Sequence, residues 1–319
     1  MPEISIIIPC FDGERYIEET VRSALDQALD ADSTSHEVVV VDDGSTDRSA
    51  AIVARMAASD SRLRVIRREN RGVARARNAG LAACDRGTRY VMFLDADDVL
   101  VDSAVARLSS RLEADPTLVA AFGPCSRIDS SGVQISPPEE PVNVREAAGG
   151  AVTLVRGPDR VGYWRMLPVT PISTPGQVLI RRDALTQADP FDPATVPCED
   201  WDLWLRLARV GDFGVVAGEV LRYRDHISSA SKRYALMMKQ RETVLKKQRS
   251  LVAPSERRDL RVAWRYAMYR FDADLCRTWA VQQLAEHNLV GAMRYAVRSA
   301  RFTTRMLVAT AAGQPRGPR

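Results

Sequence analysis

Three aspartates follow a strongly apolar run near the end of the first hundred residues. The segment from Tyr90 to Leu100 reads YVMFLDADDVL, so Asp95, Asp97 and Asp98 come directly after five apolar residues. Crowded carboxylates at the end of a buried strand repel one another and need a positive partner. Mg²⁺ and Mn²⁺ prefer oxygen ligands, commonly one or two carboxylates completed by phosphate oxygens. The segment therefore predicts a divalent-cation site, although an acidic loop that only caps the next helix has the same pattern.

Two other apolar runs are also followed by acidic turns. The first is followed by Asp12 in PCFDGERY, and the second ends at Asp42 in VVVVDDGSTDRS, where Asp47, Thr46 or Ser45 suits the cap of a helix. Open α/β sheets bind ligands beyond the carboxyl ends of their strands, so these acids should converge with the YVMFLDADDVL acids. Neither turn carries the GxGxxG pattern, which removes the main support for a dinucleotide site.

Candidate residues outside these turns are three arginines, an aspartate and a histidine. Arg71, Arg75 and Arg77 lie at the start of a predicted helix in NRGVARARNAGLAA, either as solvated surface groups or as phosphate ligands. Asp200 opens the helix of CEDWDLWLRLAR, where it is either a helix-dipole partner or a catalytic acid or base. His226 follows a predicted strand, and a single histidine is often structural.

The elements that must position these residues alternate along the chain. Short unbroken runs of Ile and Val suit strands buried on both faces of a parallel sheet. We expect strands at Ile4–Ile8, Val38–Val41, Leu63–Ile66, Tyr90–Leu94 and Leu118–Phe122, and helices at Glu14–Leu29, Asp47–Ala58, Val73–Ala83 and Asp102–Ala114. This alternation predicts an α/β fold built from βαβ units.

The rest of the chain is less regular and then becomes basic. Residues 123–176 have the composition of long loops, after which a strand at Gln177–Arg181 and a helix at Asp200–Val210 are expected. Short strands follow around Phe213–Val216 and Val220–Tyr223, and the pattern is helical from Ser231 onward. From residue 221 to the end the chain has 21 Lys and Arg against 7 Asp and Glu, whereas the first 220 residues have 24 against 34. An acidic body and a basic tail suggest two regions with different roles.

The totals limit the class of protein. A chain of 319 residues that is 45% hydrophobic can bury a sizeable core. The five cysteines are scattered and show no metal-finger spacing, which favours a reducing compartment. Neither a signal peptide nor a run of roughly 18 apolar residues is recognisable. We expect a cytoplasmic protein, either soluble or peripheral at the inner face of the cell membrane.

Five segments, in their order along the chain, resemble the motifs of the family 2 glycosyltransferases. They read SIIIPCFDGERYIEETVRSAL, VVVDDGSTDRS, NRGVARARNAG, FLDADD and CEDWDLWLRLA. The resemblance covers roughly Ile4–His226. It implies an inverting enzyme of the GT-A type, with a Rossmann-like, mostly parallel sheet flanked by helices. We expect a transferase domain at 1–226, with a nucleotide-binding part at about 1–120 and an acceptor-side part at about 121–226, before a basic helical region at 227–319.

The resemblance also implies which residues bind the donor nucleotide. Pro9, Phe11 and Glu14 match the first-loop motif, whose aromatic residue lies near the base. Asp42 matches a residue that contacts the base, and Arg77 matches an arginine near the nucleotide. The family usually has Tyr-Asn where this chain has Phe11-Asp12, which changes the hydrogen bonds expected in the first loop but keeps an aromatic ring there.

The remaining implied roles concern the metal and the chemistry. Asp95 and Asp97 match the DxD motif, which holds a divalent metal, Mn²⁺ or Mg²⁺, on the donor diphosphate, and His226 resembles a histidine that some members place on that metal. Asp200 matches the expected general base. The implied donor is a nucleoside-diphosphate sugar, with a UDP-sugar as the first choice. The implied acceptor is a glycan or a lipid-linked glycan, in cell-surface polysaccharide or glycolipid assembly.

Alternatives remain for the tail and for the whole chain. The basic helices are either solvated faces covering the main domain or a surface for an anionic membrane, and no nucleic-acid motif accompanies them. A non-catalytic nucleotide-sugar-binding or scaffold protein is the first rival to an enzyme. A sugar-1-phosphate nucleotidyltransferase is the second, but PCFDGERY lacks the Gly-rich, basic loop that a triphosphate needs.

Overall fold

A computed structural model gives the structure of the chain in two compact units. One unit comprises Met1–Tyr163 with Pro171–Arg241, and the other comprises Trp164–Thr170 with Glu242–Arg319. The structure describes residues 3–28, 35–139, 147–148, 151–152, 159–167, 170–225, 234–285 and 288–311.

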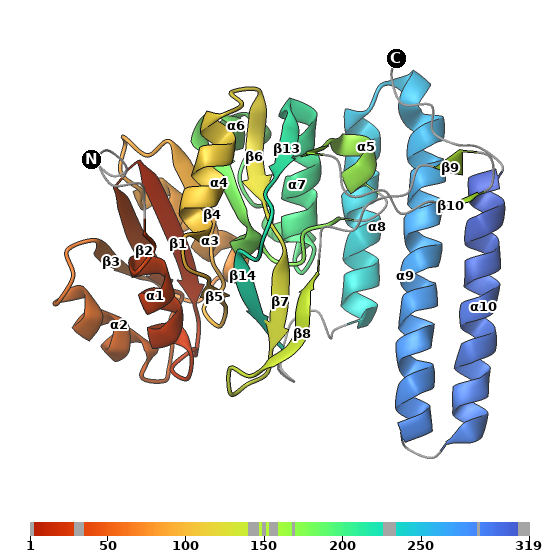
Figure 1. The fold of residues 1–319 in the computed structure, drawn as a ribbon, viewed down its shortest axis with the longest axis horizontal. Helices are drawn as coiled ribbons and strands as arrows, with labels where there is room; N and C mark the ends of the chain where they lie inside the picture. The colour runs from red at the N-terminus through yellow and green to blue at the C-terminus, as the bar shows by residue number, and fades with distance from the viewer. Residues whose placement is uncertain are drawn as a thin grey trace. The chain divides into compact units, whose positions relative to one another are not determined.

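An eight-stranded sheet forms the centre of the first unit (Figure 1). Its strands, in spatial order, are β11 (Arg160–Val161), β13 (Asp212–Val215), β6 (Leu118–Phe122), β12 (Val178–Arg181), β4 (Tyr90–Phe93), β1 (Ile4–Cys10), β2 (His36–Asp42) and β3 (Leu63–Arg67). The strands from β4 to β3 are mutually parallel, and β12 is antiparallel to both of its neighbours. The predicted α/β fold with a mostly parallel sheet is confirmed.

Helices pack on both faces of this sheet because its strands are apolar on both sides. The helices of this region are α1 (Ile17–Leu25), α2 (Ser49–Ala57), α3 (Val73–Ala83), α4 (Ala104–Glu113), α6 (Arg182–Ala188) and α7 (Glu199–Val210). Ile6 and Ile8 of β1 share one core with buried residues of α1 and α4. On the other face α3 approaches so closely that a Cβ on Gly80 would lie 2.3 Å from Cγ2 of Ile7.

A second sheet occupies part of the stretch that the sequence predicts as irregular. Its four strands, in spatial order, are β5 (Val99–Leu100), β14 (Leu221–Arg224), β7 (Cys125–Ile128) and β8 (Gln134–Glu139). Short pieces complete the region: β9 (Ala147–Ala148), β10 (Ala151–Val152), the helix α5 (Tyr163–Met166), and 3₁₀ turns at Pro175–Gln177 and Pro193–Thr195. The second sheet pairs β14 with strands about a hundred residues earlier, which local sequence patterns do not reveal.

Most of the predicted elements are confirmed, with differences at their ends. The helix Val73–Ala83 and the strand Leu118–Phe122 have the predicted bounds. The helix predicted from Glu14 begins three residues later, at Ile17. The expected cap at Ser45 or Thr46 is wrong, because α2 begins only at Ser49, whose backbone N–H donates to Asp47 Oδ1 at 2.9 Å.

The basic C-terminal region is helical, as its sequence predicts. It consists of α8 (Tyr234–Leu251), a 3₁₀ turn at Pro254–Glu256, α9 (Arg257–Ala285) and α10 (Leu289–Ala311). Helices α9 and α10 lie side by side as an antiparallel hairpin, where Ser299 Oγ donates to the carbonyl of Ala273 at 2.9 Å (Figure 1). No helix among the described residues is long and apolar enough to cross a membrane.

Candidate active site

The loops after β1 and β2 are joined by hydrogen bonds at one edge of the sheet. Cys10 and Asp42 are register partners at the ends of the two strands. Two residues beyond β1, Asp12 has a left-handed backbone with φ of 48°. Its Oδ1 accepts from the backbone N–H of Thr46 at 2.7 Å, and its own N–H donates to Ser45 Oγ at 3.1 Å. Asp12 therefore connects the two loops, and its carboxylate is used within the protein.

Glu14 has a similar connecting role in the first loop. Its backbone N–H donates to Asp47 Oδ2 at 2.9 Å, and its Oε2 accepts from the side-chain Nε of Arg48 at 3.0 Å. These hydrogen bonds with Arg48 lower the pKa of the Glu14 carboxyl. Pro9 is buried within β1, while Phe11 is 50% exposed at the tip of the loop. The fixed loop thus presents an aromatic ring to solvent at the carboxyl edge of the sheet.

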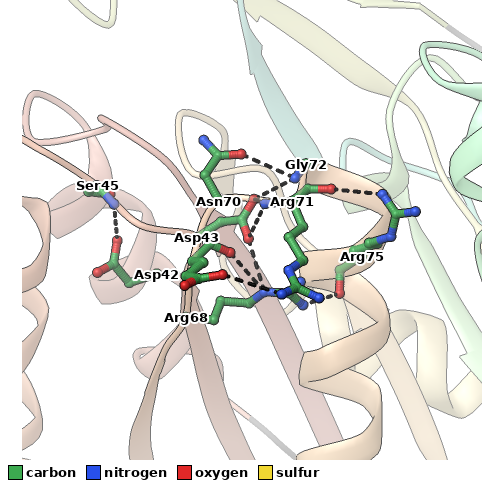
Figure 2. A network of polar contacts seen from close by, with 9 residues as sticks. Asp42, Asp43, Ser45, Arg68, Asn70, Arg71, Gly72 and Arg75 are labelled. Atoms are coloured by element: carbon green, nitrogen blue, oxygen red, sulfur yellow. Dashed lines mark hydrogen bonds and ion pairs between the residues drawn. The ribbon is translucent and has the colours of Figure 1, made fainter.

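The two acids of the second loop are buried and have different partners (Figure 2). Asp42 is 1% exposed, accepts from the N–H of Ser45 at 3.0 Å and pairs with Arg67 Nε at 3.3 Å. Asp43 is 3% exposed and accepts from the N–H of Gly72 at 2.8 Å.

Asp43 was missed by the sequence reasoning, although the sequence contains a signal for it. It also accepts from the N–H of Arg71 and pairs with Arg68 Nε at 3.1 Å (Figure 2). An anion is favoured near a helix N-terminus, but the first turn of α3 contains no acid, and Asp43 supplies the anion by accepting from backbone N–H groups at the start of the helix. The side chains of Arg71 and Arg75 are exposed, so of the three candidate arginines only Arg77 reaches the interior.

Arg77 connects two acidic segments that are far apart in sequence. It is 3% exposed, and its guanidinium lies 2.6 Å from Asp95 Oδ1 and 2.9 Å from Glu199 Oε1. The ring of Phe191 lies 5.0 Å from the guanidinium carbon. Burial opposes the charge, but Asp95 and Glu199 outweigh it and raise the pKa of Arg77. Arg77 is therefore a fixed cation beside the carboxyl end of β4.

Glu199 is the second residue that the sequence reasoning missed. It is 6% exposed, and its Oε2 has no hydrogen-bond partner among the described residues. An acid in the first turn of a helix is an ordinary dipole partner, so its sequence position gave no sign of the long-range pair with Arg77.

The three acids after β4 differ in exposure and in partners. Asp95 and Asp97 are half-buried, whereas Asp98 is fully buried. Asp95 Oδ2 and Asp98 Oδ2 each accept from Thr174 Oγ1 at 3.2 Å, and Asp98 Oδ1 accepts from the N–H of Arg224 at 2.9 Å. Burial, then the charges of Asp97 and Asp95, raise the pKa of Asp98 well above its usual range. Asp98 holds the loop in place, which leaves Asp95 and Asp97 at the surface of the site.

Arg224 is a further anchor of this loop that sequence reasoning missed. Only 2% exposed, it donates from Nε to the carbonyl of Asp97 at 2.8 Å. Its Nη2 lies 2.7 Å from Glu19 Oε2, and its guanidinium lies 4.6 Å from the ring centre of Tyr16. A buried, multiply bonded arginine on β14 thus fixes the backbone that carries the acidic loop.

Asp200 lies in the first turn of α7, beside Glu199. Trp201, Trp204 and Leu205 are buried as predicted for the core side of this helix, and Asp200 is half-buried. Burial first, and then the charge of Glu199, raise the pKa of Asp200 to about 7, although its Oδ1 accepts from the N–H of Trp201 at 2.6 Å. A carboxylate that titrates near neutral pH is suited to general base catalysis.

The carboxylate oxygens of the acidic loop fit a hard divalent cation, which would complete its coordination with other oxygens. The described residues contain no group of three or more Asp, Glu, His or Cys side chains gathered as metal ligands. Asp95 and Asp97 still supply two half-buried carboxylates, the number that Mg²⁺ sites commonly take from protein beside phosphate oxygens and water. The third predicted ligand, His226, lies outside the described residues.

Solved structures share this architecture at low sequence identity. TarS of Staphylococcus aureus has a TM-score of 0.57 at 20% identity, covering 85% of this chain and 43% of that chain. Its segment 1-349 in complex with UDP-GlcNAc has a TM-score of 0.56 at 18% identity, covering 94% of this chain and 92% of that one. The mannosyltransferase PcManGT from Pyrobaculum calidifontis, in complex with GDP-Man and Mn²⁺, has a TM-score of 0.50 at 19% identity. The match covers 100% of this chain and 76% of that one. These likenesses show the fold, which is of the GT-A type.

Sequence relatives match different shares of the chain. The uncharacterized glycosyltransferase EpsJ of Bacillus subtilis (strain 168) is 37% identical over 123 residues, which is 39% of this chain and 34% of that protein. Chondroitin synthase of Escherichia coli is 30% identical over 214 residues, which is 67% of this chain and 27% of that protein. The uncharacterized protein MT1568 of Mycobacterium tuberculosis (strain CDC 1551 / Oshkosh) is 32% identical over 260 residues, which is 78% of this chain and 75% of that protein. The chain thus spans about a third or less of the first two relatives.

The family comparison covers more than half of the chain. The model described as glycosyl transferase family 2 matches residues 5–187, which include the acidic turns after β1, β2 and β4 together with Arg77. Asp200 and Arg224 lie beyond the matched residues. On this match the chain belongs to glycosyl transferase family 2.

Proposed function

We propose that the chain is an inverting glycosyltransferase that moves a sugar from a nucleoside-diphosphate sugar to an acceptor hydroxyl. The observation that carries this proposal is the Asp95–Arg77–Glu199 bridge, with contacts of 2.6 and 2.9 Å. The bridge brings the acidic loop after β4 next to the first turn of α7, where Asp200 has a pKa near neutrality. Donor-side acids and a candidate base therefore belong to one site.

The nucleotide is proposed to lie over the loops after β1 and β2. Phe11, which is 50% exposed, offers a ring for contact with the base, and Asp42 lies at the adjacent strand end. Pro9 and Glu14 shape the first loop, and Arg77 fixes Asp95 toward the diphosphate. A UDP-sugar is the first donor to test, in line with the UDP-GlcNAc bound to the TarS segment.

Asp95 and Asp97, together with His226, are proposed to hold Mn²⁺ or Mg²⁺ on the donor diphosphate. A bound divalent cation would neutralise the negative charge that develops on the leaving group. Asp95 Oδ1 accepts from Arg77 and Asp95 Oδ2 accepts from Thr174, contacts that hold Asp95 in place beside the proposed metal.

Asp200 is proposed to act as the general base. The ionised carboxylate takes the proton of the acceptor hydroxyl while that oxygen forms its bond to the anomeric carbon. The bond between that carbon and the diphosphate oxygen breaks on the opposite side, so the configuration inverts and a nucleoside diphosphate leaves. Because the acceptor attacks directly, no covalent sugar–enzyme intermediate forms.

The acceptor is proposed to be a glycan or a lipid-linked glycan, in the assembly of cell-surface polysaccharide or glycolipid. We assign donor binding to residues 1–120 and acceptor binding to residues 121–226. This division places Asp200 on the acceptor side of the site, as its role requires.

Calorimetry of UDP binding with and without Mn²⁺ tests the metal assignment. Wild-type protein should bind UDP more tightly with Mn²⁺, and Asp97→Ala should lose most of that gain. Asp102→Ala is the matched control, since Asp102 is an exposed acid five residues further along the chain. Equal metal-dependent affinity in Asp97→Ala and wild type would remove Asp97 from this role.

A further inference from the structure

The last helix of the chain combines strong positive charge with an absence of negative charge. The sequence of α10 contains four arginines and neither Asp nor Glu. Arg294, Arg298, Arg301 and Arg305 are all exposed, and no ion pair joins them to another residue within the described part of the chain. Solvated helix faces usually alternate charges of both signs, so four arginines without counter-ions indicate an anionic partner.

The end of the hairpin where α9 meets α10 exposes large apolar side chains. Four lie on the first nine residues of α10, namely Leu289, Val290, Met293 and Val297, which are between 49% and 81% exposed. The last turns of α9 add Val281 and Leu284, which are 67% and 52% exposed. Such a concentration of exposed apolar side chains marks a contact surface.

Helical periodicity places the apolar residues and the arginines next to each other. At about 100° per residue, Leu289, Met293 and Val297 form one row, and the arginines form the adjacent row. Ala292 and Ser299 are buried on the side that packs against α9, where Ser299 donates to Ala273. Both rows therefore point away from the hairpin partner. We call these two rows, with Val290, the α10 face.

We propose that the α10 face docks on the anionic surface of a phospholipid bilayer. A bilayer offers phosphates for the arginines and, a few ångströms deeper, an apolar layer for the side chains of Leu289, Val290, Met293 and Val297. A nucleic acid would pair with the arginines but leaves the apolar row in water. A second copy of the α10 face would bring arginines against arginines.

The proposal goes beyond the transfer reaction and stands on the α10 face alone. If the proposed function also holds, docking would hold the enzyme beside acceptors that are anchored in the same membrane. Vesicle binding needs neither donor nor acceptor, so its failure and the failure of the proposed function are distinguishable.

Co-sedimentation of the full chain with lipid vesicles tests the proposal. We expect binding to vesicles of phosphatidylcholine mixed with phosphatidylglycerol, weak binding to phosphatidylcholine alone, and a decrease with salt. The double variant Arg294→Gln/Arg301→Gln should lower the vesicle partition coefficient by about 25-fold. Each arginine near an anionic surface increases that coefficient by about fivefold. Met293→Ser/Val297→Ser should lower it as well, because it removes the apolar contact.

The matched control is Arg86→Gln/Arg222→Gln, which removes two exposed arginines of the first unit and changes the net charge equally. Its vesicle binding should equal that of the wild type, as should the UDP affinity of every variant. Equal binding to both vesicle types, or equal loss in the control, would overturn the proposal. So would a dimer, seen by light scattering, that Met293→Ser/Val297→Ser converts to a monomer without any change in vesicle binding.

Discussion

At the scale of single residues, the site depends on how buried charges are compensated. Arg77 lies between Asp95 and Glu199, so one buried cation serves two carboxylates. Asp200 lies beside this group, and burial first, then the charge of Glu199, raise its pKa to about 7. Neighbouring carboxyls with different surroundings can then take different roles, one paired with Arg77 and one able to exchange a proton.

Replacing the proposed base should remove turnover without removing donor binding. Asp200→Asn keeps the size and the hydrogen bond from Trp201 but cannot accept a proton. We expect the turnover number to fall by about 10²- to 10⁴-fold, with the UDP affinity within about twofold of wild type. Steady-state kinetics and calorimetry measure the two quantities. Wild-type turnover in Asp200→Asn would show that another group acts as the base.

The pH dependence of the reaction should report the raised pKa of Asp200. Asp200 is protonated and inactive below that pKa, so kcat/KM should increase with pH and level off above about 7. A pH profile of kcat/KM between pH 5 and pH 9 measures this limb. A rise centred near pH 4, the usual range of an aspartate, would contradict the assignment.

Sequence reasoning located the residues with local signals and missed those with distant partners. Asp95, Asp97 and Asp200 each follow or open a clear element, so their motifs are visible in the sequence alone. The partner of Arg77, Glu199, lies 122 residues away, and Arg224 contacts a carbonyl 127 residues away. Such pairs arise from the folded topology, which short-range patterns do not contain.

At the scale of elements, close packing between α3 and the sheet sets the position of Arg77. Gly80 lies one turn along the same helix, and its missing side chain allows α3 to approach Ile7 and Val41. The spacing of apolar residues predicted this helix with its observed bounds. The four-stranded sheet was not predicted, because β14 pairs with β5 and β7 across long sequence separations.

Substitution at Gly80 tests that packing. A helical glycine replaced by alanine normally gains up to about 1 kcal/mol of stability. In Gly80→Ala the new Cβ would lie 2.3 Å from Ile7, so we expect a loss of about 1–3 kcal/mol instead. The helical control Gly291→Ala meets only the flexible side chains of Gln283 and Asn288 and should stay within about 1 kcal/mol of wild type. Urea denaturation measures both, and a stabilised Gly80→Ala would disprove the close approach.

The anchoring of the acidic loop by Arg224 is tested in the same way. Arg224→Met leaves the carbonyl of Asp97 without its donor and removes the ion pair with the exposed Glu19, and we expect a loss of about 1–3 kcal/mol. Arg222→Met on the same strand is exposed and should change stability by less than about 0.5 kcal/mol. Similar losses in the two variants would show that Arg224 has no special anchoring role.

At the scale of the whole molecule, the chain combines a GT-A unit with a basic helical unit. The sequence predicted both regions from periodicity and charge, because long elements leave clear patterns. The stretch from 123 to 176 gave no such pattern, and it belongs to the part of the chain to which we assign acceptor binding.

The identity of the nucleotide product tests the central claim most directly. The protein is incubated with a panel of nucleotide sugars and with glycan acceptors or water to receive the sugar, in the presence of Mn²⁺ or of a chelator. The released nucleotides are separated by chromatography. We predict release of a nucleoside diphosphate from at least one donor, dependent on the metal and absent in Asp200→Asn. Release of pyrophosphate, or no nucleoside diphosphate from any donor that the protein binds, would contradict the claim.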